Sequence, residues 1–389
     1  MQSGIFDFPA TERIVYGQPT AVALTAEADR LGASRVFLMA SRTMSRNTDE
    51  VAKVRDALDS RYAGLYDAMP ALTPREAVLD ATRAARAVRA DLIVTFGGGS
   101  LTDAGKMVRL CLQHGIDDLD GFDAYRSTLG ADGKRENPTF DGPSVDQISV
   151  PTTLSAGDFN ATAGALDHRS KTKHSYRHHL LVPRVVILDP APTVHTPMWV
   201  WLSTGIRALD HATEGLCSQF SNPVSDMYYV HALKLLAAAL PRVKQNPRDL
   251  DARLDCQLAT WLSTAGRHGG VQMGASHAIG HALGATCGVP HGYTSCVMLP
   301  YVLRYNEPAN ADRQRLVAEA MAHPGERAAE VVSSFIGALG LPRRLTEVDV
   351  SRERFGVIAE HALHDAWLYT NPRKMSTAHD VLEILNAAA

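Results

Sequence analysis

The sequence has few cysteines and no long apolar run. Its five cysteines are widely spaced and form no Cys-X-X-Cys pair, which argues against a disulfide framework and against a structural zinc site. No stretch reaches the roughly 18 consecutive apolar residues of a membrane span, and the N-terminus lacks the pattern of a signal peptide. These absences predict a protein of the reducing cytoplasm with no membrane partner.

An excess of charge of one sign is also missing. The 39 Lys and Arg residues nearly balance the 42 Asp and Glu residues, so the composition favours neither a nucleic-acid nor a membrane-surface partner. The hydrophobic fraction of 45% is that of an ordinary globular protein that buries a core. Because 389 residues exceed a typical domain of roughly 100–200 residues, we expect two domains and a small-molecule partner.

The first half of the chain alternates short apolar strands with helical patterns. Residues 92–96 (LIVTF) are apolar without alternation, which is typical of a parallel strand covered on both faces. Further strands are expected at 13–16, 36–39, 147–150 and 184–188, and helices at 21–30 and 75–89. Residues 117–146 are rich in Asp, Gly and Pro and are predicted to be a surface excursion. The pattern indicates an α/β domain with a parallel sheet over residues 1–195.

The second half has helical periodicity and no convincing strand. Helices are expected at 202–218, 224–240, 252–265, 275–285 and 313–321. We therefore predict an all-α domain over residues 196–389.

Three consecutive glycines, Gly97, Gly98 and Gly99, lie between the strand at 92–96 and a helical pattern that starts near Asp103. Glycines let the backbone approach an anion, and a helix N-terminus adds a partial positive charge of about 0.5 e. Ser100 and Lys106 offer a hydroxyl and an ammonium group. The turn matches neither the G-X-G-X-X-G nor the Walker A pattern. We predict a dinucleotide on a variant loop, and a turn without a ligand is the alternative.

A second loop brings hydroxyl groups to the same edge of the predicted sheet. Thr152, Thr153 and Ser155 follow the strand at 147–150, and ligands of parallel sheets bind beyond the carboxyl ends of the strands. We expect these residues to face the same crevice as the glycines. Capping of a turn is an equally supported interpretation.

Four histidines of the second half form a pattern that suggests a metal. His277 and His281 are four residues apart and share one face of a helix, and His291 follows in an expected loop. His211 lies in another helical pattern. Imidazoles from two helices and a loop commonly bind catalytic Zn²⁺ or Fe²⁺. A single histidine is more often a surface or core residue, so the hypothesis depends on the four together.

Taken together, these motifs resemble the iron-containing alcohol dehydrogenase superfamily, which also includes maleylacetate reductases, glycerol dehydrogenases and, more distantly, dehydroquinate synthases. The matching segments lie at 13–17, 97–106, 151–153, 187–190, 205–215, 277–285, 290–292, 299–300 and 371–373. The resemblance implies a dehydroquinate synthase-like fold, an active site in the cleft between two domains, hydride transfer with NADH or NADPH, and a homodimer.

The resemblance also implies site residues. The cofactor would contact Ser41, Gly97, Gly98, Gly99, Ser100, Asp103, Thr152, Thr153, Ser155 and Lys173. Three metal-ligand positions correspond to His211, His277 and His291, and His281 matches an active-site histidine that is not a ligand.

One position departs from the metal-dependent members, which carry an acidic residue four positions before the first histidine. Here that residue is Arg207, and a guanidinium cannot ligate a cation. Binding of Fe²⁺ or Zn²⁺ is therefore open: either Asp210 supplies the carboxylate, or it pairs with Arg207 and leaves a metal-free pocket. Maleylacetate reductases also lack the acid. In such a site Arg207 would hold a substrate carboxylate while His281 moves a proton.

We therefore predict an NAD(P)-dependent oxidoreductase of a carboxylated oxo or enol compound such as maleylacetate, with His281, Arg207 and Asp210 as catalytic residues. Ser41 at the end of the second strand carries no carboxylate to repel the 2′-phosphate of NADPH, and Arg42 adds a positive charge next to it, so we expect use of both cofactors or a preference for NADPH. The alternative is a metal-dependent alcohol dehydrogenase, which the segment 290–300 (PHGYTSCVMLP) favours. A dehydroquinate synthase-like lyase is disfavoured because it should retain the acidic ligand. A nucleotide-binding protein without catalysis is the remaining alternative.

Overall fold

The computed structural model describes residues 3–130 and 135–389. The chain forms two compact units. One consists of Pro9–Thr196, and the other of Pro197–Ala389 together with the N-terminal segment up to Phe8.

A parallel sheet of six strands forms the centre of the first unit. The strands are β1 (Arg13–Tyr16), β2 (Val36–Ala40), β3 (Tyr62–Tyr66), β4 (Leu92–Gly97), β7 (Asp146–Pro151) and β10 (Val185–Leu188), in the spatial order β1-β10-β7-β4-β2-β3. The chain passes outward from β2 to β3, returns to pair β4 with the other side of β2, and continues to β7. The winding direction thus reverses between β2 and β4, where parallel sheets bind their ligands.

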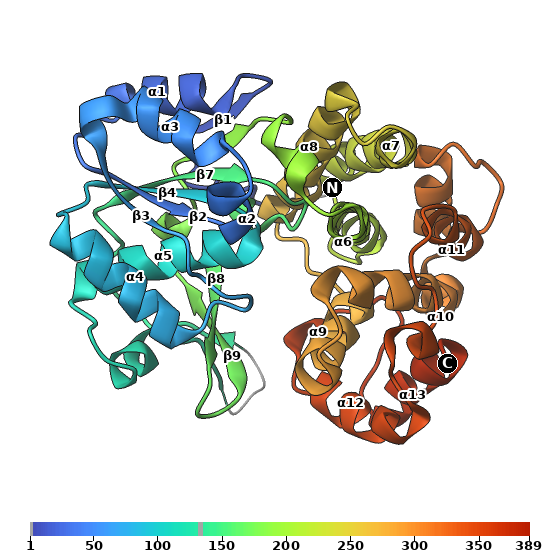
Figure 1. Ribbon diagram of the computed structural model, residues 1–389. Helices are drawn as coiled ribbons and strands as arrows, with labels where there is room; N and C mark the ends of the chain where they lie inside the picture. Colours follow the sequence, from blue (N-terminus) through green and yellow to red (C-terminus); the bar gives the residue numbers. More distant parts are fainter. Residues whose placement is uncertain (1–2, 131–134) are drawn as a thin grey trace. The chain divides into compact units, whose positions relative to one another are not determined.

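Helices cover both faces of this sheet, as Figure 1 shows. The helices are α1 (Thr20–Arg30), α2 (Arg42–Arg46), α3 (Glu50–Leu58), α4 (Arg75–Ala87) and α5 (Gly99–His114). Leu38 and Val94 pack with α1 and α3 in one core, whereas Phe37, Met39 and Ile93 pack with α4 and α5 in another. Every residue of β4 is buried because its two faces enter different cores, which explains the unbroken apolar run.

Several elements of this unit were not predicted. The antiparallel hairpin of β8 (Thr162–Asp167) and β9 (Thr172–Arg177) carries mostly polar residues in its second strand, so its sequence lacks an apolar strand signal. The predicted excursion at 117–146 contains η2 (Asp120–Tyr125) and the short strands β5 (Thr128–Leu129) and β6 (Arg135–Glu136). Phe122 of η2 is fully buried in the core below α4 and α5, so the excursion is anchored to the unit.

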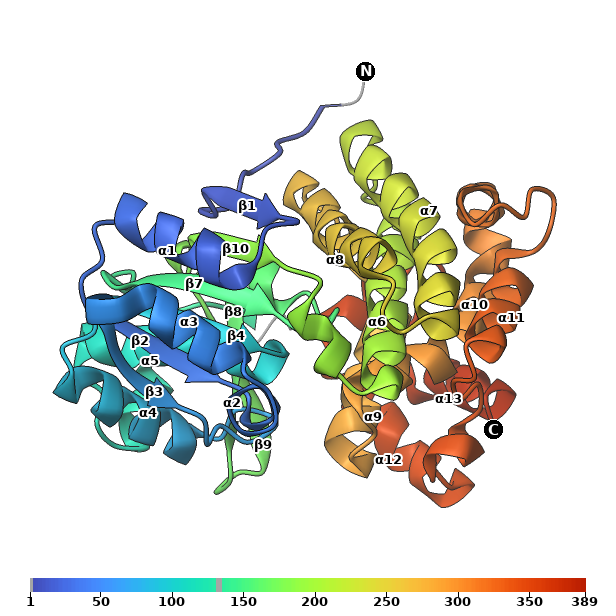
Figure 2. The same ribbon diagram turned by 45° about the horizontal axis from the view of Figure 1, so that its top comes forward.

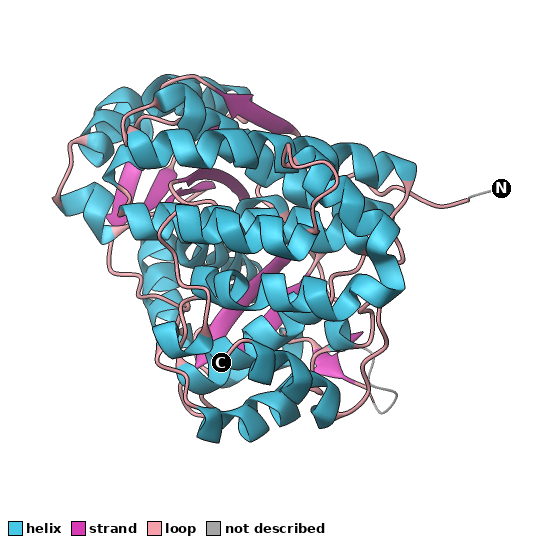
Figure 3. Ribbon diagram, turned by 90° about the vertical axis from the view of Figure 1, so that its right-hand side faces the viewer, coloured by secondary structure: helices cyan, strands magenta, loops and turns pink. Residues whose placement is uncertain are grey.

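Between Pro197 and Ala389 the regular elements are all helices, as predicted (Figure 3). Its helices are α6 (Met198–Cys217), α7 (Pro223–Gln245), α8 (Leu250–Ala265), α9 (Ala275–Cys287), α10 (His291–Ala320), α11 (Ala328–Ala338), α12 (Phe355–Ala362) and α13 (Ala378–Ala387). Helices α6, α7 and α8 pack side by side (Figure 2), and α9, α10, α12 and α13 share one apolar core. Within the described residues, no helix has the length and apolar character needed to cross a membrane.

Helix α10 is longer than the predicted helix at 313–321. It begins at His291, contains Pro300 and Pro308, and is interrupted at Asn310, where the backbone leaves the helical region. The two prolines concealed the helical pattern in the sequence because proline usually ends a helix. The expectation of a loop at His291 was therefore wrong: this histidine is the first residue of a helix.

Candidate active site

The three glycines lie at the switch point of the sheet. Gly97 ends β4, and Gly98 precedes α5 without a side-chain cap. A Cβ atom at Gly97 would lie 2.8 Å from Cδ2 of Leu101, and one at Gly99 would lie 2.6 Å from Oγ of Ser155. A larger residue at Gly97 or Gly99 would require the side chain of Leu101 or Ser155 to shift. The first N–H groups of α5 receive no side-chain cap from Gly98, and a helix N-terminus of this kind suits an anion.

The loops after β2 and β7 adjoin the same turn. The backbone N–H of Ser41 donates to the carbonyl of Phe96 at 3.0 Å, and that of Thr152 donates to the carbonyl of Gly97 at 2.8 Å. A Cβ atom at Gly98 would lie 3.1 Å from Cγ2 of Thr153. The predicted cofactor residues of three strands therefore meet at one edge of the sheet.

The remaining predicted cofactor residues make contacts within this unit. The Oγ of Ser100 accepts a hydrogen bond from the backbone of Leu72 at 3.1 Å. The Asp103 carboxylate accepts one from the backbone of Gly164 at 3.2 Å and pairs with Nζ of Lys173 at 3.3 Å. Asp103 thus attaches the β8–β9 hairpin to α5. The side chain of Lys173 is 40% exposed and remains open to a ligand.

Lys106 has a different role from the one predicted for it. It is fully buried, and its ammonium group donates to the carbonyls of Gly157, Asn160 and Thr162 at 2.7, 2.8 and 2.9 Å. Burial lowers the pKa of Lys106 to about 8. All three ammonium hydrogens are used to hold the loop after β7, so Lys106 is a structural residue and not a phosphate ligand.

In the helical unit, Arg207 and Asp210 form a buried ion pair on α6. Nη1 of Arg207 lies 3.6 Å from Oδ2 of Asp210 and donates to Oγ of Ser295 at 3.0 Å. The same Asp210 oxygen accepts hydrogen bonds from Ser295 at 2.6 Å and from Ser276 at 2.9 Å. Burial lowers the pKa of Arg207 and raises that of Asp210. The structure thus contains the ion pair of Arg207 and Asp210, and Oδ1 of Asp210 has no hydrogen-bond partner among the described residues.

Glu214, one turn further along α6, closes the N-terminus of α9. Its carboxylate accepts hydrogen bonds from the backbone N–H groups of Gly274, Ser276 and His277 at 3.0, 2.7 and 3.4 Å. The backbone N–H of Ala275 donates instead to Oδ1 of Asn371 at 3.2 Å. Two side chains from distant segments thus satisfy the N–H groups that a helix leaves unpaired at its start. Burial, together with the charge of Asp210, raises the pKa of Glu214 to about 8.

His211 and His277 lie next to each other inside the unit. Their ring centroids are 4.9 Å apart, and Nδ1 of His277 lies 2.7 Å from Oε2 of Glu214. Burial lowers the pKa of both histidines, and the positive charge of Arg207 lowers it further. Within the described chain, Nδ1 of His211 and Nε2 of His277 have no hydrogen-bond partner.

His281 and His291 form a second pair. Their rings are parallel to within 4°, with centroids 5.7 Å apart. Nδ1 of His281 lies 2.7 Å from Oδ2 of Asp365, and the Trp367 ring lies 5.4 Å from the His281 ring. Sequence analysis missed Asp365 and Trp367, because they lie more than 80 positions after His281 in a segment without periodicity.

The predicted metal ligands do not form one close cluster. In the described part of the chain, two groups of potential ligands have all their donor atoms within 4.8 Å of one another. One is Asp210, Glu214 and His277; the predicted set of His211, His277 and His291 is not among them.

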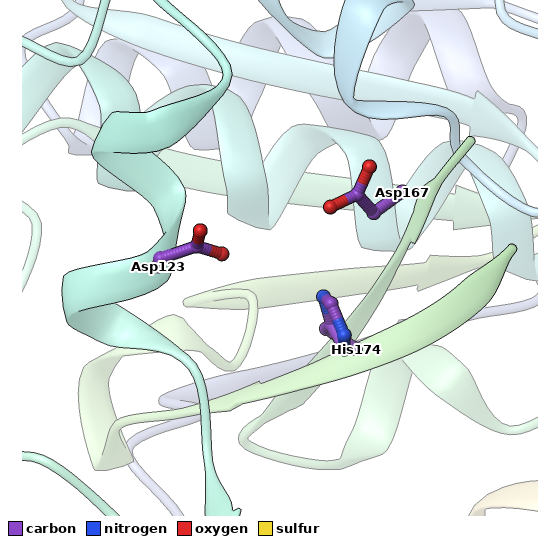
Figure 4. Close-up of side chains that lie close together, drawn as sticks. All are labelled: Asp123, Asp167 and His174. Atoms are coloured by element: carbon purple, nitrogen blue, oxygen red, sulfur yellow. The ribbon is translucent and has the colours of Figure 1, made fainter. Parts of the chain in front are cut away.

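The other group lies in the α/β unit and consists of Asp123 of η2, Asp167 of β8 and His174 of β9, which point toward one another in Figure 4. The guanidinium of Arg75 lies among them. It is 3.2 Å from Asp167 and 2.9 Å from Asp123, and its Nη2 lies 2.8 Å from Nδ1 of His174. Arg75 is fully buried and also donates to the Tyr176 hydroxyl at 2.7 Å. A fixed cation therefore occupies the place that a metal ion would need.

Comparison with known proteins identifies the family. The model described as iron-containing alcohol dehydrogenase matches residues 11–190, and the model of the C-terminal part of the Fe-containing alcohol dehydrogenase family matches residues 201–389. This chain belongs to the iron-containing alcohol dehydrogenase family. It is therefore an oxidoreductase, as the sequence predicted.

Among members of the iron-containing alcohol dehydrogenase family, Dehydrogenase FUM7 of Gibberella moniliformis is 34% identical over 97% of this chain and 96% of that protein. Maleylacetate reductase of Rhizobium sp. is 29% identical over 96% of this chain and 95% of that protein. The crystal structure of the Rhizobium reductase superimposes with a TM-score of 0.82 at 28% identity, covering 100% of this chain and 98% of that chain. The relatives thus include the reductases that the sequence resembles.

The fold is also that of a sulfoacetaldehyde reductase from Bifidobacterium kashiwanohense, solved in complex with NAD⁺. The two superimpose with a TM-score of 0.86 at 21% identity, and 100% of each chain is covered. The predicted fold class is confirmed by these neighbours of the iron-containing alcohol dehydrogenase family.

Proposed function

We propose that this member of the family is a metal-independent, NAD(P)H-dependent reductase of a carboxylated oxo or enol compound such as maleylacetate. The ion pair of Arg207 and Asp210 carries the proposal. It places a guanidinium where the metal-dependent relatives have an acidic ligand.

The positive charge of Arg207 disfavours a metal ion beside this ion pair. A cation near His211 and His277 would stand beside the positive charge of Arg207, which already lowers the pKa of both histidines. Oδ2 of Asp210 is bound by Arg207 and two hydroxyl groups, and Glu214 is bound by the start of α9. Oδ1 of Asp210, Nδ1 of His211 and Nε2 of His277 have no hydrogen-bond partner among the described residues, and these atoms are what favours the metal-dependent alternative.

The α/β unit suits a dinucleotide. Gly97, Gly98 and Gly99 leave the backbone of this turn without side chains, and the start of α5 has no side-chain cap. Both features favour close approach of a pyrophosphate. NAD(P)H, when bound, supplies the hydride for the reduction.

The helical unit suits an anionic substrate. Nε of Arg207 has no hydrogen-bond partner among the described residues, so this buried guanidinium retains a donor for a carboxylate. A second cation, Arg267, lies with its guanidinium carbon 5.2 Å from the Trp367 ring, and its charge further lowers the pKa of Arg207, His211 and His277. Sequence analysis did not identify Arg267.

His281 is suited to transfer the proton. Its side chain is 39% exposed, whereas that of His277 is only 1% exposed. In the proposed reaction, Arg207 binds the substrate carboxylate and His281 gives its proton to the substrate as the hydride adds. One substrate, one NAD(P)H and one proton thereby yield the reduced acid and NAD(P)⁺. A homodimer in the cytoplasm stays a prediction.

Metal removal tests the proposal. Protein stripped with a chelator and checked for residual metal is expected to oxidise NADH or NADPH with maleylacetate at the rate of metal-loaded protein, within about twofold. Turnover that returns only with Fe²⁺ or Zn²⁺ would contradict metal independence. It would support a metal-dependent alcohol dehydrogenase, which the close group of Asp210, Glu214 and His277 favours. Absence of turnover in both preparations would exclude maleylacetate as the substrate.

Cofactor preference gives a second test. Ser41 caps α2 by accepting a hydrogen bond from the backbone of Met44 at 3.4 Å, and it carries no negative charge to repel a 2′-phosphate. We expect kcat/KM with NADPH to lie within tenfold of that with NADH, which corresponds to about 1.4 kcal/mol. Ser41→Asp should keep the cap and lower kcat/KM for NADPH at least tenfold.

The matched control is Ser41→Asn, which also caps the helix but adds no charge. It should leave the ratio of the two catalytic efficiencies near that of the wild type. A wild-type preference for NADH above tenfold would refute the expectation.

A further inference from the structure

The carboxylate of Asp365 contacts the histidine that the proposed function uses for proton transfer. Asp365 comes from the segment between α12 and α13, and its Oδ2 lies 2.7 Å from Nδ1 of His281 on α9. This distance is that of a strong hydrogen bond. The contact joins residues 84 positions apart in the chain.

The other oxygen of Asp365 is fixed as well. Oδ1 accepts a hydrogen bond from the backbone N–H of Trp367 at 2.9 Å, which caps the short helix η9 (Ala366–Leu368). The Asp365 side chain is 16% exposed, so the surrounding chain holds it in place. The carboxylate is thus oriented by its own backbone before it contacts the imidazole.

The imidazole ring is held by its neighbours. His291 lies parallel to it, and the Trp367 ring is tilted by 34° at 5.4 Å. A carboxylate at Nδ1 favours the tautomer that carries its hydrogen on Nδ1. Nε2 is then the ring nitrogen that gains and loses the transferred proton.

We propose that Asp365 is a positioning residue that orients His281 and selects its Nδ1–H tautomer, so that Nε2 exchanges a proton with the substrate. The catalytic consequence rests on the proposed function, but the tautomer is a property of the protein alone. The role of Asp365 in selecting the tautomer and its effect on catalysis can therefore be refuted independently.

Asp365→Asn is the deciding variant. An asparagine oxygen still caps η9, but the amide no longer offers a carboxylate to the ring. In full-length protein labelled with ¹⁵N-histidine, we expect nitrogen NMR to show His281 as the Nδ1–H tautomer, with the signal assigned by its loss in His281→Gln. In Asp365→Asn the Nε2–H tautomer should become the main form.

Turnover provides the second readout. With maleylacetate and NADH, Asp365→Asn should lower kcat by about 10²-fold and leave KM within twofold. Asp365→Glu, which keeps the charge, should recover part of the loss. In the His281→Gln background, Asp365→Asn should cause no further decrease, because Asp365 acts through the ring.

Asp249→Asn is the matched control, since Asp249 caps α8 by accepting from the backbone of Ala252 at 3.0 Å. It should change neither the His281 tautomer nor kcat. An unchanged tautomer in Asp365→Asn would overturn the positioning role, whatever the turnover. If wild-type protein does not reduce maleylacetate, the proposed substrate fails and the NMR result still decides the role of Asp365.

Discussion

Arg207→Met is expected to lower the free energy of unfolding by about 3–5 kcal/mol at pH 8, because it leaves the Asp210 carboxylate buried without its cation. Methionine has a similar volume and fills the same space. Ser276 and Ser295 still donate to Asp210, but hydroxyl groups do not supply a compensating charge. Denaturation by urea, followed by circular dichroism, measures the change.

The loss should depend on pH in a defined direction. Burial already raises the pKa of folded Asp210, and Arg207 opposes that increase. In the variant the folded pKa rises further, while the unfolded value stays near about 3.9. Below the unfolded pKa the Asp210 carboxyl is protonated in both the folded and the unfolded state, so it carries no charge that would destabilise the folded protein. Stability is then lost as the pH rises from the unfolded toward the folded pKa, so the variant should be closer to wild type at pH 5 than at pH 8.

Arg253→Met is the control for this prediction. Arg253 is also buried, but it lies 4.6 Å above the Trp201 ring and donates to the carbonyl of Pro247. Its replacement should cost stability with little dependence on pH. A loss in Arg207→Met that is equal at pH 5 and pH 8 would mean that Asp210 does not depend on Arg207.

His281→Gln is expected to lower kcat for maleylacetate by about 10²–10⁴-fold, the usual contribution of a positioned general acid. Glutamine retains the size of the ring and a hydrogen bond to Asp365, but it cannot transfer a proton. Steady-state oxidation of NADH measures kcat and KM. Binding of NADH, followed by its fluorescence, should be unchanged.

His361→Gln provides the comparison, because His361 is an exposed histidine near the end of the helix α12 of the same unit. It should retain wild-type kcat. A decrease of less than tenfold in His281→Gln would assign the proton to another group, and the stacked neighbour His291 would be the next residue to replace.

The fold was predictable from the sequence where the pattern of neighbouring residues determines an element. The buried strands and the glycine turn are recognisable because neighbouring residues share one environment, as in the unbroken run of β4. The hairpin β8–β9 was not recognisable, and this omission misled the interpretation of Lys106. The hairpin packs on α5, and Lys106 of α5 binds the carbonyl of Thr162 at the start of β8. A lysine that was expected to offer its ammonium group to a phosphate is therefore buried and bound to backbone carbonyls.

The active-site region shows the same limit. His277 and His281 were predicted to share a face because four positions on a helix determine it. Arg207 and Asp210 are three positions apart on the same helix, so their pairing was also foreseen, as one of two alternatives for Asp210. Asp365 contacts His281 from another segment, and the charge of Arg267 acts on Arg207, His211 and His277 from a third. No spacing in the sequence indicates interactions of that kind.

The closure of α9 has a consequence for synthesis of the chain. Its first N–H groups are bound by Glu214 of α6 and by Asn371, which lies 96 residues after its partner Ala275. A nascent chain that has just released α9 from the ribosome lacks the second of these side chains. The histidine-bearing helix reaches its final position only when the C-terminal segment has emerged, so this region matures late and the α/β unit can fold ahead of it.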